Sequence, residues 1–504
     1  MNSVYIQIII NILLTIISNL LLFFINKYFL QVFNIELLGL MKLFTQILAY
    51  LKILESGLVT ASNFAFYRVL AQKDNVKLNI LFSSIRFIYR NIFILILTLG
   101  TLMAPFLSFF IKENIPNHNI YIYWILYIIG ATIPYLYSHF TILMAADQRI
   151  IIVKYVHFII SILTFFLQIF IIFKTKSFFA FIFVIIITEI LKYYIFKYIN
   201  SKYYSYIKIV KERDYSILQK LKKLVFHKLS DLIIQNTDLV LISRFISLNV
   251  VGIYASYLMI NNIIITFLET ITYILRPRIG KNISKNDNLY NYQKYQELNI
   301  FFLYIGTCLT LSSFYLINDF VKLWIGDLYL LDKIVIILMH INIMIYISKM
   351  ILEIFKEGYG FFDDIHLSFL EALIKLSFSL VLIKYVGLKG VVIGTLISNI
   401  LIVCTARPIT IYSICFKKNI FDYLKNYLQY LLIIIVSVLI NHNILTRFII
   451  SKSIINSWYE WFLNAVIITI IVVISNILIF LINSQFRKKI SEINIIKNKI
   501  LKLF

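Results

Sequence analysis

The sequence is poor in charge, in acidic residues and in cysteine. Only 14% of its 504 residues are charged, and 48 Lys and Arg outnumber 24 Asp and Glu, for a net charge of +24. With 61% hydrophobic residues, this composition excludes a disordered chain and an ordinary soluble enzyme, and it is typical of a helical protein with many membrane spans. Cys308, Cys404 and Cys415 have no metal-binding spacing, so we interpret them as small hydrophobic residues.

Several functional motifs are missing as well. No G-x-x-x-x-G-K-[ST] stretch occurs, so the sequence offers no phosphate-cradling loop for ATP-driven transport. The predicted outer loops are short, which disfavours a membrane-bound transferase or polymerase, and we expect neither enzyme activity nor a cofactor. The first apolar segment has no basic region before it and no A-x-A-like site, so we expect a retained helix and not a cleaved signal peptide.

Apolar runs of about 20 residues are abundant, and this is the length that crosses ~30 Å of hydrocarbon as a helix. They predict an all-α membrane protein with about fourteen transmembrane helices, arranged as two pseudo-symmetric six-helix bundles around a central cavity plus two C-terminal helices. The segments 36–60 and 226–246 are the least hydrophobic. The predicted spans are 4–26, 36–60, 91–111, 120–143, 150–173, 177–197, 226–246, 249–274, 297–317, 333–353, 365–385, 388–412, 424–440 and 460–482.

Basic residues collect in alternate loops between these spans. With the N-terminus inside, most of the 48 Lys and Arg fall in the inner loops and the C-terminal tail, as expected for cytoplasmic segments. We therefore expect a multi-pass protein of the bacterial cytoplasmic (inner) membrane with both termini in the cytoplasm. The excess of positive charge is then explained by topology and contact with anionic lipid, and we expect no nucleic acid as a partner.

The longest inner loop separates two halves with a similar pattern. Gly39 is followed sixteen residues later by Glu55, and Gly252 is followed seventeen residues later by Glu269. The shared order and spacing indicate a parallel duplicated unit, and in transporters a site commonly lies at the interface between repeats. The predicted organisation is an N-terminal six-helix bundle at 1–197, a basic cytoplasmic linker at 198–225, a C-terminal six-helix bundle at 226–415, and two additional helices with a basic tail at 416–504.

Polar residues recur at helical spacing in the first two predicted helices of each half. In lipid such stripes must face protein or water, because an unpaired polar group there costs several kcal/mol. We therefore predict a water-accessible substrate cavity shared by the halves. Interhelical hydrogen bonding is the alternative for Asn, Ser and Thr, but it explains the ionisable residues less well. The predicted cavity residues are Asn19, Lys42, Gln46, Lys52, Glu55, Asp231, Gln235, Asp238, Asn262 and Glu269.

Charged pairs stand inside two predicted helices. Lys52 and Glu55 are three residues apart, and each such charge near the bilayer centre costs roughly 2.5–3.5 kcal/mol. The two can neutralise each other one helical turn apart, whether their role is structural or functional. Glu371 and Lys375 form a similar pair, whereas Glu189 has no evident partner.

Four stretches resemble the polysaccharide flippases, of the O-antigen and capsule repeat-unit type, in the multidrug/oligosaccharidyl-lipid/polysaccharide (MOP) exporter superfamily. The resemblance covers the first twelve predicted helices, while the last two match only in hydrophobicity. The matching stretches are GLMKLFTQILAYLKILESGLVTASNFAFYRVLAQKD at 39–74, ADQRIIIVKYV at 146–156, HKLSDLIIQNTDLVLISRFISLNVVGIYASY at 227–257, and 358–408, which begins GYGFFDDIHL. By position, Glu55, Gly57, Asp238 and Gly252 match family positions.

The resemblance implies a flippase that moves an undecaprenyl-pyrophosphate-linked oligosaccharide repeat unit from the cytoplasmic to the outer leaflet. It implies alternating access, in which one bundle rocks against the other, and a polysaccharide polymerase as a partner. The headgroup would cross through the cavity while the lipid tail stays in the bilayer. Some related flippases have a strongly cationic cavity, whereas intramembrane acids outnumber bases here, which argues against an acidic glycan.

Roles for individual residues follow from this hypothesis. Lys42 and Lys52 would bind pyrophosphate, and Glu55, Asp238 and Glu269 would carry a coupling H⁺ or Na⁺, since a carboxylate in a low-dielectric site can exchange a proton near neutral pH. Two rival functions remain open: export of multiple drugs or organic cations by the same superfamily, and flipping of a peptidoglycan or teichoic-acid precursor. The arginines expected at the cytoplasmic mouth, where topology also places bases, are Arg68, Arg276, Arg278 and Arg407.

Overall fold

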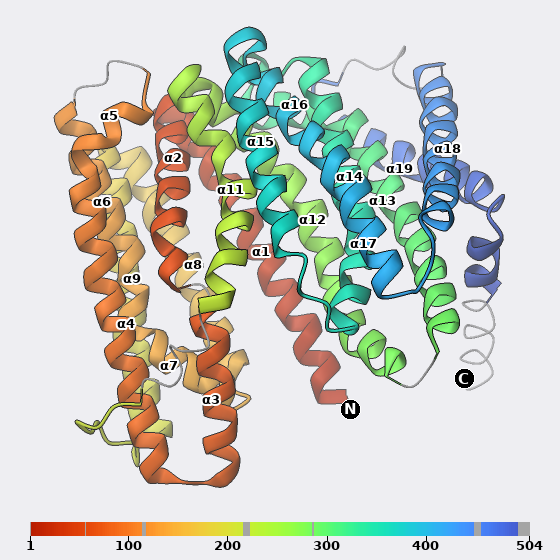
Figure 1. Cartoon of the computed structure of the whole chain (residues 1–504). Helices are drawn as coiled ribbons and strands as arrows, with labels where there is room; N and C mark the ends of the chain where they lie inside the picture. Colours follow the sequence, from red (N-terminus) through yellow and green to blue (C-terminus); the bar gives the residue numbers. More distant parts are fainter. Residues whose placement is uncertain are drawn as a thin grey trace. The chain divides into compact units, whose positions relative to one another are not determined.

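A computed structural model of the chain consists of helices joined by short loops (Figure 1), and no strand occurs among the residues it describes. These are residues 2–55, 57–112, 117–214, 222–284, 287–447 and 455–491. The chain divides into two compact units, Met1–Gly252 and Ile253–Phe504. The predicted all-α fold class is therefore confirmed.

Unit 1 contains the helices and turns that precede α12. Its elements are α1 (Asn2–Val32), α2 (Ile35–Leu51), the 3-10 turn η1 (Lys52–Glu55), α3 (Leu58–Gln72), α4 (Asn75–Met103), the turn η2 (Ala104–Phe106), α5 (Leu107–Phe110), α6 (Asn117–Thr132), α7 (Pro134–Ala146), α8 (Ile150–Thr175), α9 (Phe178–Tyr203) and α11 (Lys222–Phe245).

Unit 2 contains the remaining helices, of which α12 starts in unit 1. Its elements are α12 (Leu248–Ile283), α13 (Asn288–Ile325), the turn η3 (Asp327–Tyr329), α14 (Lys333–Gly358), α15 (Ile365–Val386), α16 (Leu388–Ser398), the π-helix η4 (Asn399–Ala406), α17 (Arg407–Ile414), α18 (Ile420–Leu445) and α19 (Trp458–Phe480).

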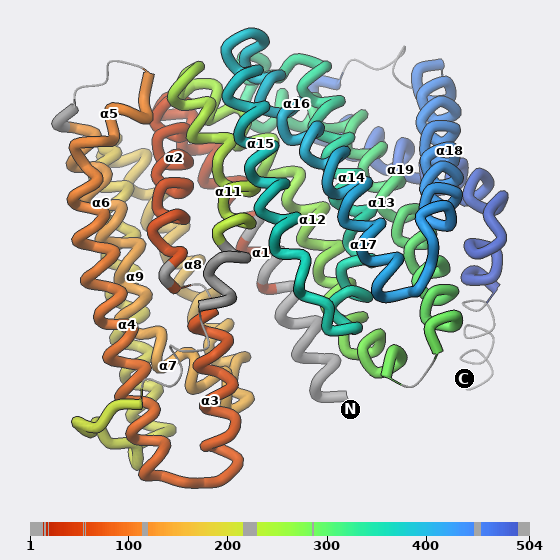
Figure 2. The backbone as a smooth tube through the Cα atoms, viewed as in Figure 1, coloured from red at the N-terminus to blue at the C-terminus, as the bar shows by residue number. Residues whose placement is uncertain are grey.

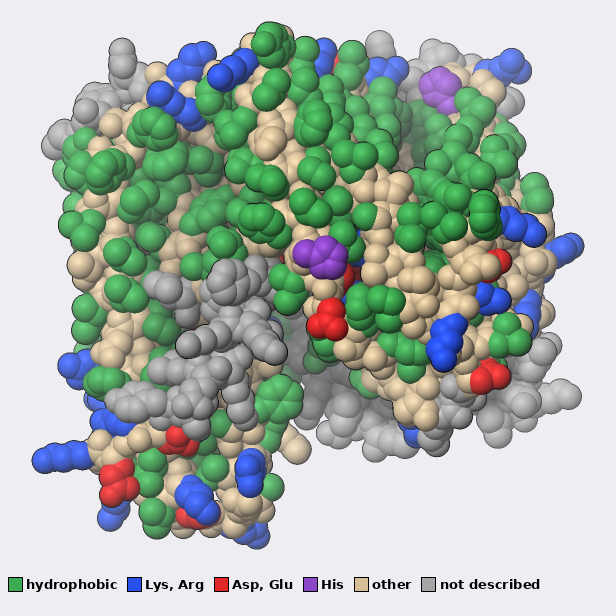
Figure 3. Space-filling model, viewed as in Figure 1, with side chains coloured by type: hydrophobic (Ala, Val, Ile, Leu, Met, Phe, Trp, Pro, Cys, Tyr) green, Lys and Arg blue, Asp and Glu red, His purple; other side chains and the backbone are tan. Residues whose placement is uncertain are grey.

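Eleven helical stretches among the described residues are long and apolar enough to cross a membrane. The two segments predicted to be least hydrophobic correspond to α2 and α11, and neither is among these eleven. In α1, the part described in full is the shorter apolar helix Leu20–Val32. The count of fourteen spans is therefore not confirmed. Figure 3 shows hydrophobic side chains over α4 and α6, while charged side chains gather near the turn between α3 and α4, as expected for a membrane protein.

Short polar side chains cap many of these helices. Each accepts a hydrogen bond from a backbone N–H of the first turn, which satisfies a donor that has no partner inside the helix. The turn between α13 and α14 and the turn before α19 are fixed in this way. The capping residues are Asn34 for α2, Asp74 for α4, Ser177 for α9, Asp287 for α13, Asp332 for α14 and Ser457, in a capping box with Glu460, for α19.

The segment predicted as one helix over 36–60 is interrupted, and the chain path can be followed in Figure 2. α2 ends at Leu51, η1 follows, and Gly57 adopts a φ of 84° before α3 begins. That left-handed conformation costs little only for glycine, so Gly57 fixes the place of the break. The prediction of one continuous helix here is wrong because hydrophobicity does not report backbone conformation.

The two glycines that mark the repeat contact each other's helices in unit 1. A Cβ at Gly39 of α2 would lie 2.0 Å from the Leu248 carbonyl oxygen, and a Cβ at Gly252 of α12 would lie 2.5 Å from the Ile35 carbonyl oxygen. Only glycine permits this approach of two backbones. The contact joins α2 to the first turn of α12.

The segment after α9 lies along the start of α4 as far as it is described. Its backbone N–H groups donate to side chains of α4: Lys208 to Asn79 at 2.8 Å, and Val210 to Ser83 at 3.0 Å. α9 continues to Tyr203, six residues into the predicted basic linker. The described residues that follow are held by hydrogen bonds to α4.

Candidate functional site

A cavity of about 980 Å³ lies inside unit 2, between one face each of α13, α14 and α18. On α14 its lining residues recur every three or four positions from Lys333 to Leu352, a helical stretch about 28 Å long at 1.5 Å per residue. That length is close to the ~30 Å hydrocarbon thickness of a bilayer. We call this elongated cavity the slot.

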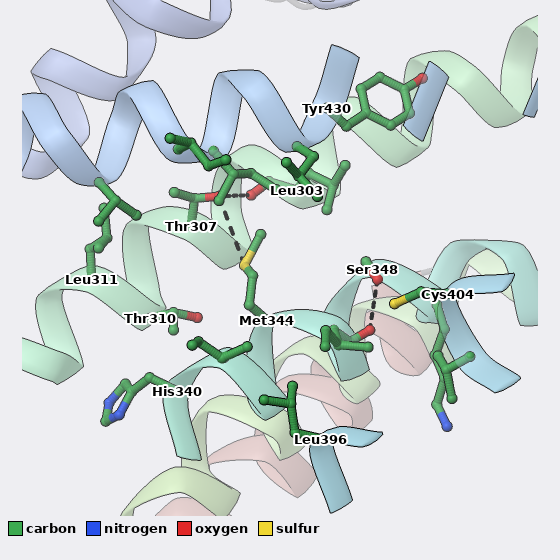
Figure 4. A pocket seen from close by; sticks show the side chains of 18 of the residues that line it. Leu303, Thr307, Thr310, Leu311, His340, Met344, Ser348, Leu396, Cys404 and Tyr430 are labelled. Atoms are coloured by element: carbon green, nitrogen blue, oxygen red, sulfur yellow. Dashed lines mark hydrogen bonds between the residues drawn. The ribbon is translucent and has the colours of Figure 1, made fainter. Parts of the chain in front are cut away.

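The walls of the slot are mainly apolar and aromatic, and several of their polar groups are satisfied by their own helix (Figure 4). The Thr307 hydroxyl donates to the Leu303 carbonyl at 2.7 Å, and the Ser348 hydroxyl donates to the Ile345 carbonyl at 2.7 Å. His340 uses Nδ1 for the Ile336 carbonyl of its own helix. These side chains therefore present mostly carbon to the slot, which suits an apolar occupant.

The charge of the slot is positive. Among the described residues that line it, the charged side chains are Lys333 and Lys349, and none is acidic. The two lysines lie sixteen residues apart on α14, about 24 Å along the helix axis. Lys349 is 19% exposed, and its Nζ lies 3.9 Å from Glu371 Oε1 and 5.0 Å from the centroid of the Tyr346 ring.

A buried group of ion pairs packs behind the Lys349 end. Arg407 contacts Glu371 at 3.0 Å, Glu353 at 3.5 Å and Asp364 at 3.6 Å. Lys356 contacts Glu353 at 2.8 Å and Asp364 at 2.9 Å. Each of the three carboxylates therefore has a cation within 3.0 Å, although two cations are shared among three acids in this part of the unit.

The wall at this end is built from a π-helix and a proline. η4 ends at Ala406, and Pro408 in the next turn has no N–H to donate to the carbonyl of Cys404. The Tyr423 hydroxyl of α18 donates to that carbonyl instead. This hydrogen bond joins α18 to η4 across the slot, and π-helical turns often occur at functional sites.

The predicted pair Lys52 and Glu55 belongs to a polar cluster in unit 1. Lys52 lies within electrostatic reach of both Glu55 and Glu189. Glu189 accepts a hydrogen bond from the Tyr137 hydroxyl at 2.7 Å and forms an ion pair with Lys192 at 2.7 Å. Glu189, which had no evident partner in the sequence, is therefore paired one helical turn away within the predicted span 177–197.

Other predicted cavity residues lie on α2 and α11, which pack together in unit 1. The Tyr50 hydroxyl and the Thr237 hydroxyl are 2.8 Å apart and join these helices. Asp238 lies within electrostatic reach of Tyr50. Lys42 and Gln46 are half-buried on α2, and on α11 Asp231 is half-buried whereas Gln235 is exposed. The side chain of Asn19 lies outside the described residues.

The predicted residues of α12 are exposed. Asn262 and Glu269 lie on one face, and the Tyr346 hydroxyl of α14 donates to Glu269 Oε1 at 2.8 Å. The predicted cavity would be formed by residues of both units. It stays a prediction, as do the roles of these side chains.

The four arginines expected at a cytoplasmic mouth differ in their surroundings. Arg68, Arg276 and Arg278 are exposed, and Arg276 lies 3.4 Å from Glu357. Arg407 is 5% exposed and bound by the carboxylates described above. The positive charge of Arg407 is therefore balanced by carboxylates of unit 2. Likewise Glu371, predicted to pair with Lys375, contacts Arg407 and Lys349.

The residues of the slot were not predicted from the sequence. Those of α18 begin at Tyr423 and recur with Tyr427, Tyr430 and Ile434 at three- and four-residue spacing. In a sequence, such a stripe predicts a face packed against another helix. The cavity beside it is formed by the arrangement of α13, α14 and α18. The sequence signal that could have indicated this site was Lys349, a base four residues before the acid Glu353 inside an apolar stretch.

Comparison with known proteins identifies the fold. No family model matches the chain, and no curated protein matches it by sequence. Among solved structures, the lipid II flippase MurJ in an inward closed conformation aligns with a TM-score of 0.69 at 14% identity, over 94% of this chain and 98% of that chain.

Two further similar structures are described as members of the MOP superfamily. A multidrug resistance MATE family transporter in an inward-facing conformation aligns with a TM-score of 0.64 at 15% identity, over 82% of this chain and 94% of that chain. A MOP superfamily transporter from Pyrococcus furiosus aligns with a TM-score of 0.54 at 15% identity, over 82% of this chain and 95% of that chain. This chain is a multi-pass membrane protein with the fold of the MOP superfamily transporters.

Proposed function

We propose that this chain is a flippase that moves undecaprenyl-pyrophosphate-linked oligosaccharide repeat units from the cytoplasmic to the outer leaflet. The observation that carries the proposal is the slot of unit 2, which runs about 28 Å along α14, is mainly apolar, and has lysines and no described carboxylate on its lining. Its length and charge match a substrate with one long hydrocarbon chain and a negatively charged group.

Physical chemistry favours such a substrate over a compact one. A cavity of about 980 Å³ is at the upper end of the volumes usual for small-molecule sites, and here the volume is drawn out along three helices. A saccharide headgroup would need many polar partners, whereas the hydroxyls at Thr307 and Ser348 already donate within their helices. The hydrocarbon chain is thus the part of the substrate that fits the slot.

Coupling to a cation is the second part of the proposal. Glu55 lies in the turn between α2 and α3, within electrostatic reach of Lys52 and of Tyr135. The break in the helix leaves backbone groups without intrahelical partners, so a proton or Na⁺ could be exchanged there. Glu55→Gln should then stop transport while the protein is still made, and equal transport by the variant would remove this role.

Export of organic cations is the competing function, because MATE transporters share the fold. Its expected recognition element is an acidic side chain in the binding pocket. The described lining of the slot contains none, so the slot is a poor site for a cation. Flipping of a peptidoglycan or teichoic-acid precursor uses the same kind of amphiphile and differs only in the headgroup.

The test is the leaflet in which lipid-linked oligosaccharide accumulates in a deletion strain, measured by its accessibility to an external glycosidase. We expect accumulation on the inner face, relieved by the wild-type gene but not by Lys52→Ala or Glu55→Gln. Lys77→Ala, at an exposed lysine that forms an ion pair with Asp74 just before α4, is the matched control and should relieve it. Normal outward display in the deletion strain, together with greater sensitivity to cationic drugs, would overturn the proposal in favour of export.

A further inference from the structure

Resting on this proposed function, we propose that the Lys349 end of the slot binds the phosphate of a single-chain isoprenoid lipid, whose hydrocarbon chain lies along α14. The binding group is the Lys349 ammonium, and the rest of the slot holds the chain. This assigns a place on unit 2 to the part of the substrate that joins the lipid to the sugar.

The charge of Lys349 is only partly balanced by the protein. Its nearest described carboxylate, Glu371, is 3.9 Å away and already lies 3.0 Å from Arg407. The half-buried Glu353 and the buried Asp364 contact Lys356 at 2.8 and 2.9 Å, and Glu353 is also within electrostatic reach of Lys349. Lys349 is therefore held in position by a carboxylate that has a closer cation, and it keeps attraction for a further anion.

Lys349 is also oriented toward the slot. Its side chain lines the cavity, and its Nζ lies over the Tyr346 ring at 5.0 Å from the centroid. The Tyr346 hydroxyl is in turn fixed by Glu269 at 2.8 Å. A lysine restrained by an aromatic face and by a carboxylate loses less conformational freedom on binding than one in solvent.

Hydroxyl groups lie near the same end. Cys404 of η4 is within electrostatic reach of Lys349 and within hydrogen-bonding reach of Tyr427. Tyr423 and Tyr430 line the slot within one turn of Tyr427 on α18. A phosphate beside Lys349 would compete with the Cys404 carbonyl for the Tyr423 O–H. The phosphate is favoured in that exchange because charge-assisted hydrogen bonds are about twice as strong as neutral ones.

The position of this site separates the two ends of the ligand. From Lys349 the slot continues along α14 toward Lys333, about 24 Å away along the helix axis. The wall between them includes Met344, Ile341 and Ile337, which are apolar. An extended hydrocarbon chain can lie along this wall, whereas a free phosphate ion would use only the Lys349 end.

Binding to the purified full-length chain tests the inference. We would measure undecaprenyl phosphate, undecaprenol, inorganic phosphate and phosphatidylglycerol by native mass spectrometry. We expect undecaprenyl phosphate to bind more tightly than undecaprenol. Lys349→Gln should weaken the phosphate form by about 10- to 100-fold, as expected for loss of a charge-assisted hydrogen bond, and leave undecaprenol unchanged. Lys384→Gln, at an exposed lysine of α15 that does not line the slot, is the control and should bind as the wild type does.

Three results would overturn the inference. The first is equal binding of undecaprenyl phosphate by Lys349→Gln and the wild type. The second is competition by phosphatidylglycerol at equal concentration, which would make the slot a site for ordinary bilayer lipid. The third is competition by inorganic phosphate, which would make it a site for a soluble anion. If Lys349→Gln does not fold, Lys349→Arg keeps the charge and should retain binding, and its loss of binding would count against the inference.

The leaflet assay separates this inference from the proposed function. If the wild-type gene relieves inner-face accumulation and Lys349→Gln relieves it equally, the function stands and the phosphate site fails. If the deletion strain displays its oligosaccharide normally, the function fails, and the binding measurement still decides whether the slot recognises a lipid phosphate.

Discussion

Replacing Arg407 by methionine should destabilise unit 2 much more than replacing Arg276 in the same way. The Arg407 side chain is 6% exposed and contacts carboxylates of Glu371, Glu353 and Asp364. Arg276 is 50% exposed and contacts Glu357 at 3.4 Å. The two substitutions remove the same charge from the same unit, so their difference isolates the effect of burial.

The loss of stability depends on the carboxylates that each substitution leaves without their arginine. Removing one partner of a buried ion pair costs about 3–5 kcal/mol, because the other charge stays buried without compensation. Glu371 would keep Lys349 at 3.9 Å and Asp364 would keep Lys356 at 2.9 Å, which places Arg407→Met near the lower limit of about 3 kcal/mol. An exposed pair is worth about 0.2–1 kcal/mol.

Thermal unfolding of the purified chain measures the difference. At roughly 2–4 °C per kcal/mol for a unit of this size, Arg407→Met should lower Tm by about 6–12 °C and Arg276→Met by less than about 4 °C. Adding Glu371→Gln to Arg407→Met should restore part of the loss, with a coupling energy of about 0.5–3 kcal/mol. A Tm for Arg407→Met within experimental error of that of Arg276→Met would refute the argument from burial.

Three further predictions concern packing and a thiol. Gly39→Ala should lower Tm because its Cβ would lie 2.0 Å from the Leu248 carbonyl oxygen. Gly280→Ala should not, because its Cβ would have no described atom outside its own helix within 4 Å. Asn476→Leu should weaken the contact between α18 and α19 by about 0.6–1.7 kcal/mol, since the buried Asn476 amide is hydrogen-bonded to α18; an unchanged Tm would contradict this. Burial raises the pKa of the Cys415 thiol to about 11, so its labelling by maleimide should be slow at pH 7.5, rise with pH, and become fast on unfolding.

The sequence predicted the helices better than their interruptions. Long apolar runs marked most spans within a few residues, because a helix in lipid must satisfy its backbone internally and needs about 20 apolar residues. The break at Gly57 was not predicted, since a φ of 84° leaves no trace in hydrophobicity. The close approach at Gly39 and Gly252 was visible only as a repeated spacing, without its physical reason.

The candidate site was harder to predict than the fold. Arg407 was expected at the cytoplasmic mouth because loops rich in bases lie on the cytoplasmic side. Its carboxylate partners could not be predicted, since they are 36 to 54 residues away in the chain and meet it only through folding. The partners are Glu353, Asp364 and Glu371. The slot was missed for a related reason: a stripe of Tyr and Ile on α18 looks the same whether a neighbouring helix or a cavity lies beside it.

Corresponding acids of the two repeats have different surroundings, and this bears on the proposed cation coupling. Glu55 follows the end of α2 in a turn before Gly57, where Lys52 lies within electrostatic reach. Glu269 lies within the continuous helix α12, is exposed, and accepts a hydrogen bond from Tyr346. A glutamine at 269 keeps an amide oxygen that can accept the same bond, whereas a glutamine at 55 loses the negative charge that opposes Lys52. Glu269→Gln should therefore retain more transport than Glu55→Gln in the leaflet assay, and equal loss from both would contradict a coupling site confined to Glu55.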